Sequence, residues 1–227
     1  RTAEGAALMT DTSLSRRIIG AAYPRHFNKP IALAMHKNMR AIGMPEWSDD
    51  DQEFARAFQE FMEAEEITGL KTEIEDIEIP LDEPRSGGSD DIGDVSWNVP
   101  TVTLRYPSNI AGRQGHHWSS AIAMATPVAH KGAAAGAKVV AATLLDLVQN
   151  ESLLEASWEY FREEQTANES YVPFISDEDL PAIEKNADVM AEFKERLRGL
   201  YYDPSEFDSY LEQLGVEYPQ LTRPEQE

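Results

Sequence analysis

The sequence predicts an α/β fold in which helices dominate and a few strands take part. Two observations predict the helices: apolar residues recur every three or four positions in residues 51–62 and again in residues 131–150. A third predicts strands, because residues 97–106 alternate in character and residues 6–20 read as an extended segment. The length of 227 residues allows one large domain or two small ones.

The composition excludes several classes of function before any motif is considered. Hydrophobic residues make up 41% of the chain, which is enough to form a core, and the absence of cysteine excludes disulfides, thiol nucleophiles and cysteine-based metal sites. The formal net charge of −21 argues against a nucleic-acid partner, because phosphate binding needs a basic surface. The acid is dispersed, as on proteins that work in concentrated salt, so salt-dependent stability is a hypothesis.

Local signals place the elements of the first half. Asn28 is a candidate N-cap two residues before Pro30, and a helix over residues 31–42 should stop at Gly43. Residues 48–51 form a second helix start, with acid at the positive end of the helix dipole. That helix has an apolar face made of Phe54, Phe58, Phe61 and Met62.

The second half reads as loops followed by helices. Residues 72–89 and 107–114 are predicted loops, and helices are expected over 131–150, 153–165 and 187–200, before an acidic tail over 204–227. The most apolar stretch, residues 132–148, is interrupted by Lys138 and Asp146 and is short for a membrane span, so we expect no membrane partner. No signal pattern is visible, and we expect a cytoplasmic protein.

Three of the five histidines lie close together in the sequence: His116, His117 and His130. A neutral imidazole at the entrance of a helix can bind zinc, which makes His130 a candidate ligand, with His116 and His117 ranked below it. A histidine just before a helix is more commonly a surface or capping residue, and that interpretation stays open.

A glycine-rich acidic segment is the second candidate site. Gly87, Gly88 and Ser89 can bring main-chain amides close to a carbonyl or carboxylate oxygen, because glycine lacks a side chain. Asp90, Asp91 and Asp94 follow and are potential ligands of a hard cation, although their spacing is not that of an EF-hand. The alternative is an ordinary flexible acidic surface loop.

These elements resemble a known family. The run Gly-Gly-Ser-Asp-Asp-Ile-Gly-Asp-Val-Ser-Trp at residues 87–97, followed by Ala-His-Lys-Gly at residues 129–132 opening an Ala-rich helix, resembles the p-aminobenzoyl-glutamate hydrolase family in its B-subunit type. That family is part of the superfamily of di-zinc aminoacylases, carboxypeptidase G and succinyl-diaminopimelate desuccinylase. The resemblance covers about the first three-quarters of the chain.

The resemblance implies a fold and a chemistry. Residues 1–45 would be the end of a lid or dimerisation domain, and residues 46–227 the C-terminal part of a catalytic domain with a mixed sheet flanked by helices. Two divalent metal ions, zinc or manganese, would activate a water that attacks the amide of an N-acyl amino acid such as p-aminobenzoyl-glutamate. His130 would be one metal ligand, and Gly87, Gly88 and Ser89 would line the substrate pocket.

The chain departs from this family in one large respect. The His-x-Asp motif, the bridging Asp, the Glu pair and the lid histidine are not in this sequence, and neither His26 nor His36 lies where it would replace the last of these. One histidine cannot hold two metal ions, so we expect the chain alone to be inactive. It begins with Arg1, and we interpret it as part of a longer protein whose N-terminal part supplies the remaining ligands.

Three functions compete on this basis. The first is one part of a two-part amidohydrolase, with the N-terminal part of the enzyme, a small amide substrate and a second copy bound through the lid as partners. The second is a binding or regulatory module that retains the fold without the chemistry, and the third is a structural domain with incidental histidines. Trp97 and Trp118 are either stacking surfaces for an aromatic substrate or core residues.

Overall fold

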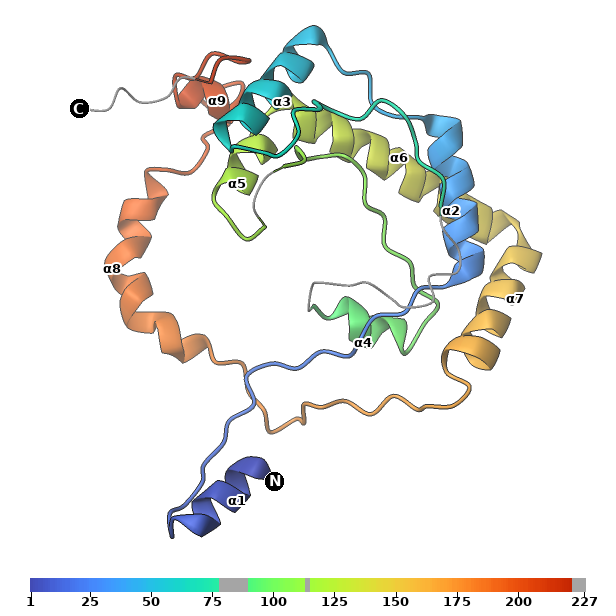
Figure 1. Ribbon diagram of the computed structural model, residues 1–227, viewed down its shortest axis with the longest axis vertical. Coiled ribbons are helices and arrows are strands. Elements are labelled where there is room, and N and C mark those ends of the chain that lie inside the picture. Colours follow the sequence, from blue (N-terminus) through green and yellow to red (C-terminus); the bar gives the residue numbers. More distant parts are fainter. Residues whose placement is uncertain (78–89, 113–114, 222–227) are drawn as a thin grey trace.

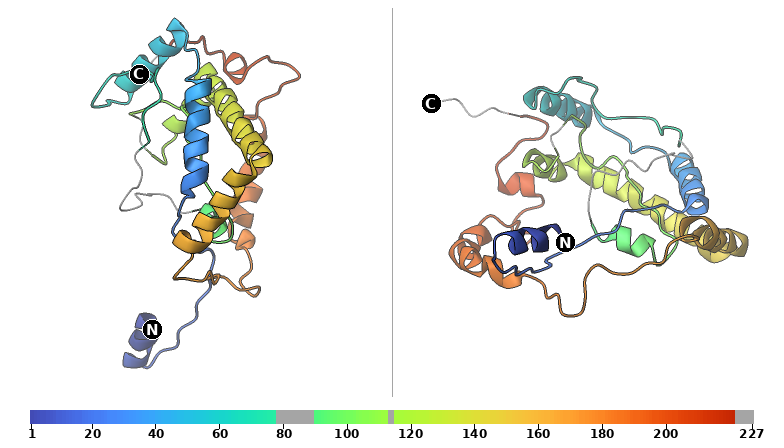
Figure 2. Two further views of the ribbon diagram at one scale, coloured as in Figure 1. Left: turned by 90° about the vertical axis from the view of Figure 1, so that its right-hand side faces the viewer. Right: turned by 60° about the horizontal axis from the view of Figure 1, so that its bottom comes forward.

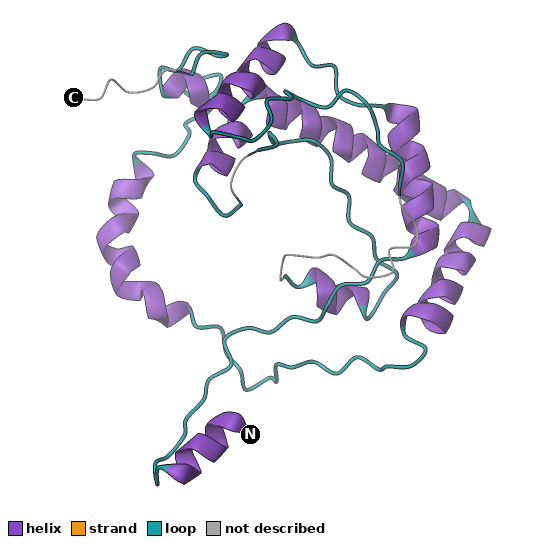
Figure 3. Ribbon diagram, in the orientation of Figure 1, coloured by secondary structure: helices purple, strands orange, loops and turns teal. Residues whose placement is uncertain are grey.

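The computed structural model describes residues 1–77, 90–112 and 115–221, and in these ranges the protein is helical (Figures 1 and 3). The order of the α-helices is α1 (Thr2–Met9), α2 (Lys29–Ile42), α3 (Asp49–Phe61), α4 (Ile92–Ser96), α5 (Ser119–Met124), α6 (Pro127–Gln149), α7 (Glu151–Tyr160), α8 (Ala187–Arg198) and α9 (Tyr210–Gln213). A π-helical turn, Phe161–Gln165, extends α7, and a 3₁₀ turn, Ile183–Asn186, precedes α8.

The predicted α/β fold with a mixed sheet is wrong for the described part of the chain, where no residue belongs to a strand. The strand predicted over residues 97–106 is absent: Trp97 caps α4, and residues 101–106 have no regular secondary structure. In the described ranges a single backbone hydrogen bond joins residues 101–106 to another segment, from Asn28 N to Thr101 O at 2.8 Å. A strand exists only when a neighbouring segment completes the hydrogen-bond ladder. Residues 6–20 are likewise not extended throughout, because α1 occupies Thr2–Met9.

Two small groups of helices carry the packing. In the first, α2 lies against α6 and α7, with Ile31 and Met35 of α2 buried and Val139 of α6 fully covered. The second is a cluster of buried residues around α3 and the start of α6. Its members are Phe54, Ala55, Phe58, Leu70, Ile110, Ala123 and Val128. Helices α1 and α8 have no buried residues and extend away from these groups (Figure 2).

Helix ends follow the predicted caps. The side chain of Asn28 accepts a hydrogen bond from Ile31 N at 3.4 Å, and Ser48 and Asp51 form a reciprocal capping box at the start of α3. Gly43 closes α2 with a φ of 79°, a conformation that glycine adopts at little cost. The cap prediction for Asn28 and both helix starts are therefore confirmed.

Helix α6 is the longest in the described ranges and the one there that is long and apolar enough to cross a membrane, judged by length and composition alone. The same criterion is met by core helices of soluble proteins. In this structure α6 packs against α2, α5 and α7. Its apolar residues Val140, Leu144 and Val148 remain exposed.

Candidate functional site

The predicted substrate-binding residues Gly87, Gly88 and Ser89 lie outside the described residues. The acidic residues that follow them are described, and they serve contacts within the protein. Asp90 lies 3.5 Å from the buried guanidinium of Arg25, and Asp94 accepts hydrogen bonds from Tyr23 N at 3.2 Å and from the Tyr171 hydroxyl at 2.9 Å. These carboxylates therefore anchor α4 to two distant segments.

His130 lies in the first turn of α6, and its side chain is exposed. It borders a cavity of about 460 Å³ between the start of α6 and the C-terminal segment. The cavity combines carboxylates with apolar walls. Its lining residues are Pro127, His130, Ser209, Leu211, Glu212, Gly215, Val216, Glu217 and Tyr218. The structure thus places the strongest candidate residue at a concave surface.

Contacts of the neighbouring residues Val128, Lys131 and Gly132 fix the position of the turn on which His130 lies. Val128 is completely buried in the α3 cluster, and the ammonium of Lys131 lies 2.5 Å from the carboxylate of Asp51. Gly132 packs directly on the chain at Pro107, where a Cβ atom would meet the Pro107 carbonyl oxygen at 2.0 Å. A side chain at the end of a rigid element is better positioned than one on a loop.

Asp51 is the centre of this scaffold and is 1% exposed. Its Oδ2 accepts from Ser48 N at 2.8 Å and from Lys131, and its Oδ1 accepts from the Tyr218 hydroxyl at 2.8 Å. Burial by itself would raise the pKa of Asp51, but the hydrogen bonds from Lys131, Ser48 and Tyr218 outweigh it and hold the pKa below its ordinary value. For Tyr218, burial and the bond to Asp51 raise the pKa of the phenol.

The other two candidate histidines, His116 and His117, lie in the loop before α5 and make their contacts there. His117 Nδ1 lies 2.9 Å from the Ser119 hydroxyl and accepts from Ser119 N at 3.3 Å, and its ring packs on Trp118. His116 is exposed and has a φ of 54°, which is unusual for a residue with a side chain. Both positions fit the capping and loop roles that the sequence left open.

The described residues do not fit a di-metal centre by themselves. Within these ranges no group of three or more His, Asp or Glu side chains is close enough together to hold a metal ion. His130 therefore has too few ligand neighbours in the described part of this chain, and no catalytic step can be assigned to a metal bound by these residues alone.

Sequence reasoning did not identify a buried network around His26. Gln165 Nε2 donates to His26 Nδ1 at 2.9 Å, while Gln165 Oε1 accepts from Asn28 Nδ2 at 2.9 Å. His26 Nε2 is buried without a hydrogen-bond partner among the described residues, and burial lowers the pKa of this imidazole. Glutamine and histidine so far apart in sequence give no local signal of their pairing.

The two candidate tryptophans have different surroundings. Trp97 packs on His26 with ring centroids 4.6 Å apart, and its indole nitrogen donates to Pro24 O at 3.0 Å. Trp118 is 58% exposed, with one edge toward Phe61. Trp97 therefore has the role of a packing residue, whereas more than half of the Trp118 surface is exposed.

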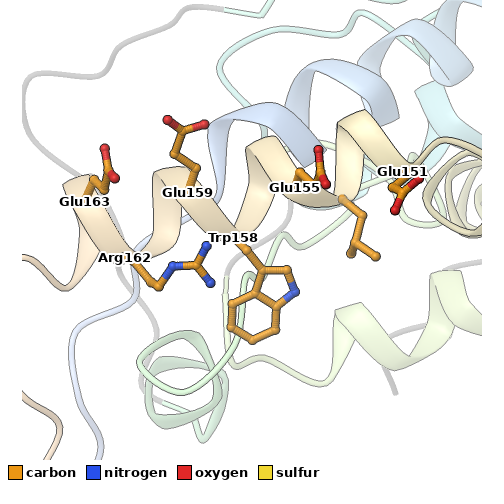
Figure 4. Close-up of a pocket in the computed structure, with 7 residues that line it drawn as sticks. Glu151, Glu155, Trp158, Glu159, Arg162 and Glu163 are labelled. Carbon is orange, nitrogen blue, oxygen red and sulfur yellow. The ribbon is translucent and has the colours of Figure 1, made fainter.

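A second hollow lies along α7 and its π-helical turn, with a volume of about 730 Å³ (Figure 4). Glutamates from successive turns line it, and the Arg162 guanidinium lies over the Trp158 ring at 6.0 Å from the centroid. None of the residues that the sequence predicted for the site is there. Its carboxylates fit a solvated helix face.

Comparison with known proteins identifies a relative. The chain is 28% identical over 177 residues to the B subunit of p-aminobenzoyl-glutamate hydrolase from Escherichia coli (strain K12). The predicted family resemblance is confirmed. The match covers 68% of this chain but 37% of the Escherichia coli protein, so the chain spans well under half of that relative.

Two further comparisons give no match. No protein-family model matches the sequence, and no solved structure matches it. The similarity to p-aminobenzoyl-glutamate hydrolase is therefore the finding on which a functional assignment must rest, together with the surroundings of His130.

Proposed function

We propose that this chain is one part of an amide hydrolase that cleaves an N-acyl amino acid of the p-aminobenzoyl-glutamate type. The observation that carries the proposal is the similarity to p-aminobenzoyl-glutamate hydrolase. The scaffold of His130 supports it, because a buried carboxylate, a core valine and a close glycine contact hold the turn on which this histidine lies.

The proposal includes a partner. The chain matches 37% of its relative, whose name describes it as a subunit. We propose that an N-terminal part of the same enzyme completes the site, and that the chain alone is inactive. Two zinc or manganese ions would be held only in that complete assembly, with His130 as the one ligand from this chain. A homodimer formed through residues 1–45 and a cytoplasmic location belong to the same proposal.

A second function is favoured by a different observation. Among the described residues, no group of three or more potential metal ligands forms around His130. A binding or regulatory module related to the hydrolase would show the same arrangement, and it would hold no metal and cleave no amide.

The test uses protein purified from its native host. Intact mass and elemental analysis on one sample should give a second polypeptide and about two zinc or manganese ions per assembly, the number of the co-catalytic centre. That assembly should release p-aminobenzoate from p-aminobenzoyl-glutamate. His130→Asn should abolish the release, whereas His36→Asn, a matched change on α2, should leave it intact. A single polypeptide of 25.4 kDa without metal or activity would favour the regulatory module.

A further inference from the structure

The end of the described chain returns to α3 after a long excursion. We use the term C-terminal strap for residues 209–221, which contain α9. Nearly all residues from 167 to 208 are exposed, and α8 arches away from the packed helices between α7 and the strap (Figure 1). The excursion is anchored near its beginning, where the Tyr23 hydroxyl donates to Val172 O at 2.7 Å and the Tyr23 ring stacks on Phe174.

The strap docks through Tyr218. Its ring lies against Phe54 with centroids 5.1 Å apart, and Tyr218 and Leu221 both pack on the buried cluster of α3. Its hydroxyl donates to Oδ1 of Asp51. An aromatic residue of this kind fills apolar space with its ring and satisfies a buried acceptor with its hydroxyl.

This docking contact is joined to the turn of His130. The second oxygen of the same carboxylate accepts from Lys131, the residue that follows His130. Tyr218 also lines the cavity that His130 borders. One fully buried carboxylate therefore binds the strap on one side and the start of α6 on the other.

We infer that Tyr218 is a positioning residue for His130 and acts through Asp51 and Lys131. With the strap docked, both oxygens of the carboxylate have partners and the Lys131 side chain has one favourable place. When the strap undocks, Oδ1 of Asp51 loses the Tyr218 hydroxyl as its hydrogen-bond donor, and a buried acceptor without a donor is costly. The carboxylate is then held less firmly, and so is the Lys131 side chain that fixes the first turn of α6. That His130 is a site residue rests on the proposed function. The coupling between Tyr218 and the first turn of α6 does not.

The positioning has a thermodynamic signature. If Tyr218 and Lys131 act through one carboxylate, loss of either must weaken the contact that the other makes, because coupling between two sites is reciprocal. Two side chains that merely pack near each other would have independent effects.

The experiment measures amide hydrogen exchange by NMR on the full 227-residue chain. Tyr218→Phe keeps the ring and removes the hydroxyl. It should speed exchange about tenfold at the strap amides of Gly215 and Val216 and also at the amides of His130 and Lys131, as expected for loss of a hydrogen bond to a charged acceptor. The Cε1–H resonance of His130 should also shift or broaden in the Tyr218→Phe variant.

Controls and a double variant complete the test. Tyr202→Phe removes a hydroxyl whose partner is Phe207 O within the exposed part of the chain, so exchange at His130 should not change. Lys131→Met should speed amide exchange in the strap, and Lys131→Arg, which keeps the positive charge, should restore the slow exchange. The double variant Tyr218→Phe with Lys131→Met should speed exchange by less than the product of the two single-variant factors. Unchanged exchange at His130 in Tyr218→Phe, or fully multiplicative effects, would overturn the inference.

These measurements are made without substrate or metal. Failure of the hydrolase proposal would therefore leave the exchange results standing, and failure of the positioning inference would leave the activity assay of the assembly standing.

Discussion

The hydroxyl of Tyr218 and the carboxylate of Asp51, 167 positions apart in the sequence, form a hydrogen bond of 2.8 Å beside the ion pair between Asp51 and Lys131. Three segments of the chain thus meet at a single buried charge. A charge taken out of water must be fully compensated by such partners, and removal of any of them is costly.

Asp51→Asn should lower the free energy of unfolding by about 2 kcal/mol or more. The substitution removes the charge that pairs with Lys131 and leaves one acceptor oxygen for the three donors Ser48 N, Lys131 and Tyr218, and hydrogen bonds to a charged group are worth roughly 1.5–3 kcal/mol each. Urea denaturation measures the loss. The control is Asp50→Asn on the same helix, which is exposed and should change stability by less than about 1 kcal/mol. Equal effects of the two changes would contradict the central role of Asp51.

Acid should remove the contribution that the Asp51 carboxylate makes to the stability of the folded protein. The pKa of this carboxyl in the folded protein lies below its ordinary value of 3.8, so its contribution is complete above that value and disappears as the pH falls through the folded-state pKa. The difference in melting temperature between the wild type and Asp51→Asn should therefore be constant near neutral pH and shrink at strongly acidic pH. A difference that persists unchanged to about pH 2 would show that the charge is not responsible.

His26 should make the protein less stable as the pH falls below about 6.5. Burial lowers the pKa of the folded imidazole from its ordinary value of 6.5, so the unfolded chain binds this proton more readily. Stability relative to His26→Phe should decrease from about pH 7 toward about pH 5. NMR titration of the His26 ring should give a midpoint below 6.5, and a midpoint above that value would refute the prediction.

Gly132→Ala should destabilise the start of α6 by about 1–3 kcal/mol, the usual cost of overpacking. A Cβ atom at this position would lie 2.0 Å from the Pro107 carbonyl oxygen. Gly5→Ala is the matched control, because no described atom lies within 4 Å of a Cβ there and a helical alanine is neutral or stabilising. Thermal melting of both variants checks the pair, and equal melting temperatures would mean that α6 does not pack so closely on residue 107.

Salt should stabilise this chain. Its net charge of −21 produces self-repulsion in the compact state, and the screening length falls from about 10 Å at 0.1 M to about 3 Å at 1 M salt. The urea midpoint should rise between these concentrations of potassium chloride. Full stability in dilute buffer, unaffected by salt, would remove the hypothesis of adaptation to concentrated salt.

Helices could be predicted well because their hydrogen bonds are local. The expected helix over residues 31–42 is α2, and the one over residues 131–150 is α6, which begins earlier because Pro127 suits the first turn. The expected helix over residues 153–165 is α7 with its π-helical turn. The strand prediction for residues 97–106 was wrong for the opposite reason: alternation is a local pattern, but a strand needs a neighbouring segment to pair with, and no local signal supplies that neighbour.

The sequence by itself determined the caps at Asn28 and Ser48, the helices α2, α3, α6, α7 and α8, and the family resemblance, because these are encoded in neighbouring residues. His130 as a site residue stays a prediction. Only the tertiary structure decided that Asp51, Lys131 and Tyr218 meet beside that histidine, and that His26 pairs with Gln165. Burial creates these partnerships: a polar group removed from water must find its partner wherever the fold brings one, at whatever distance along the chain.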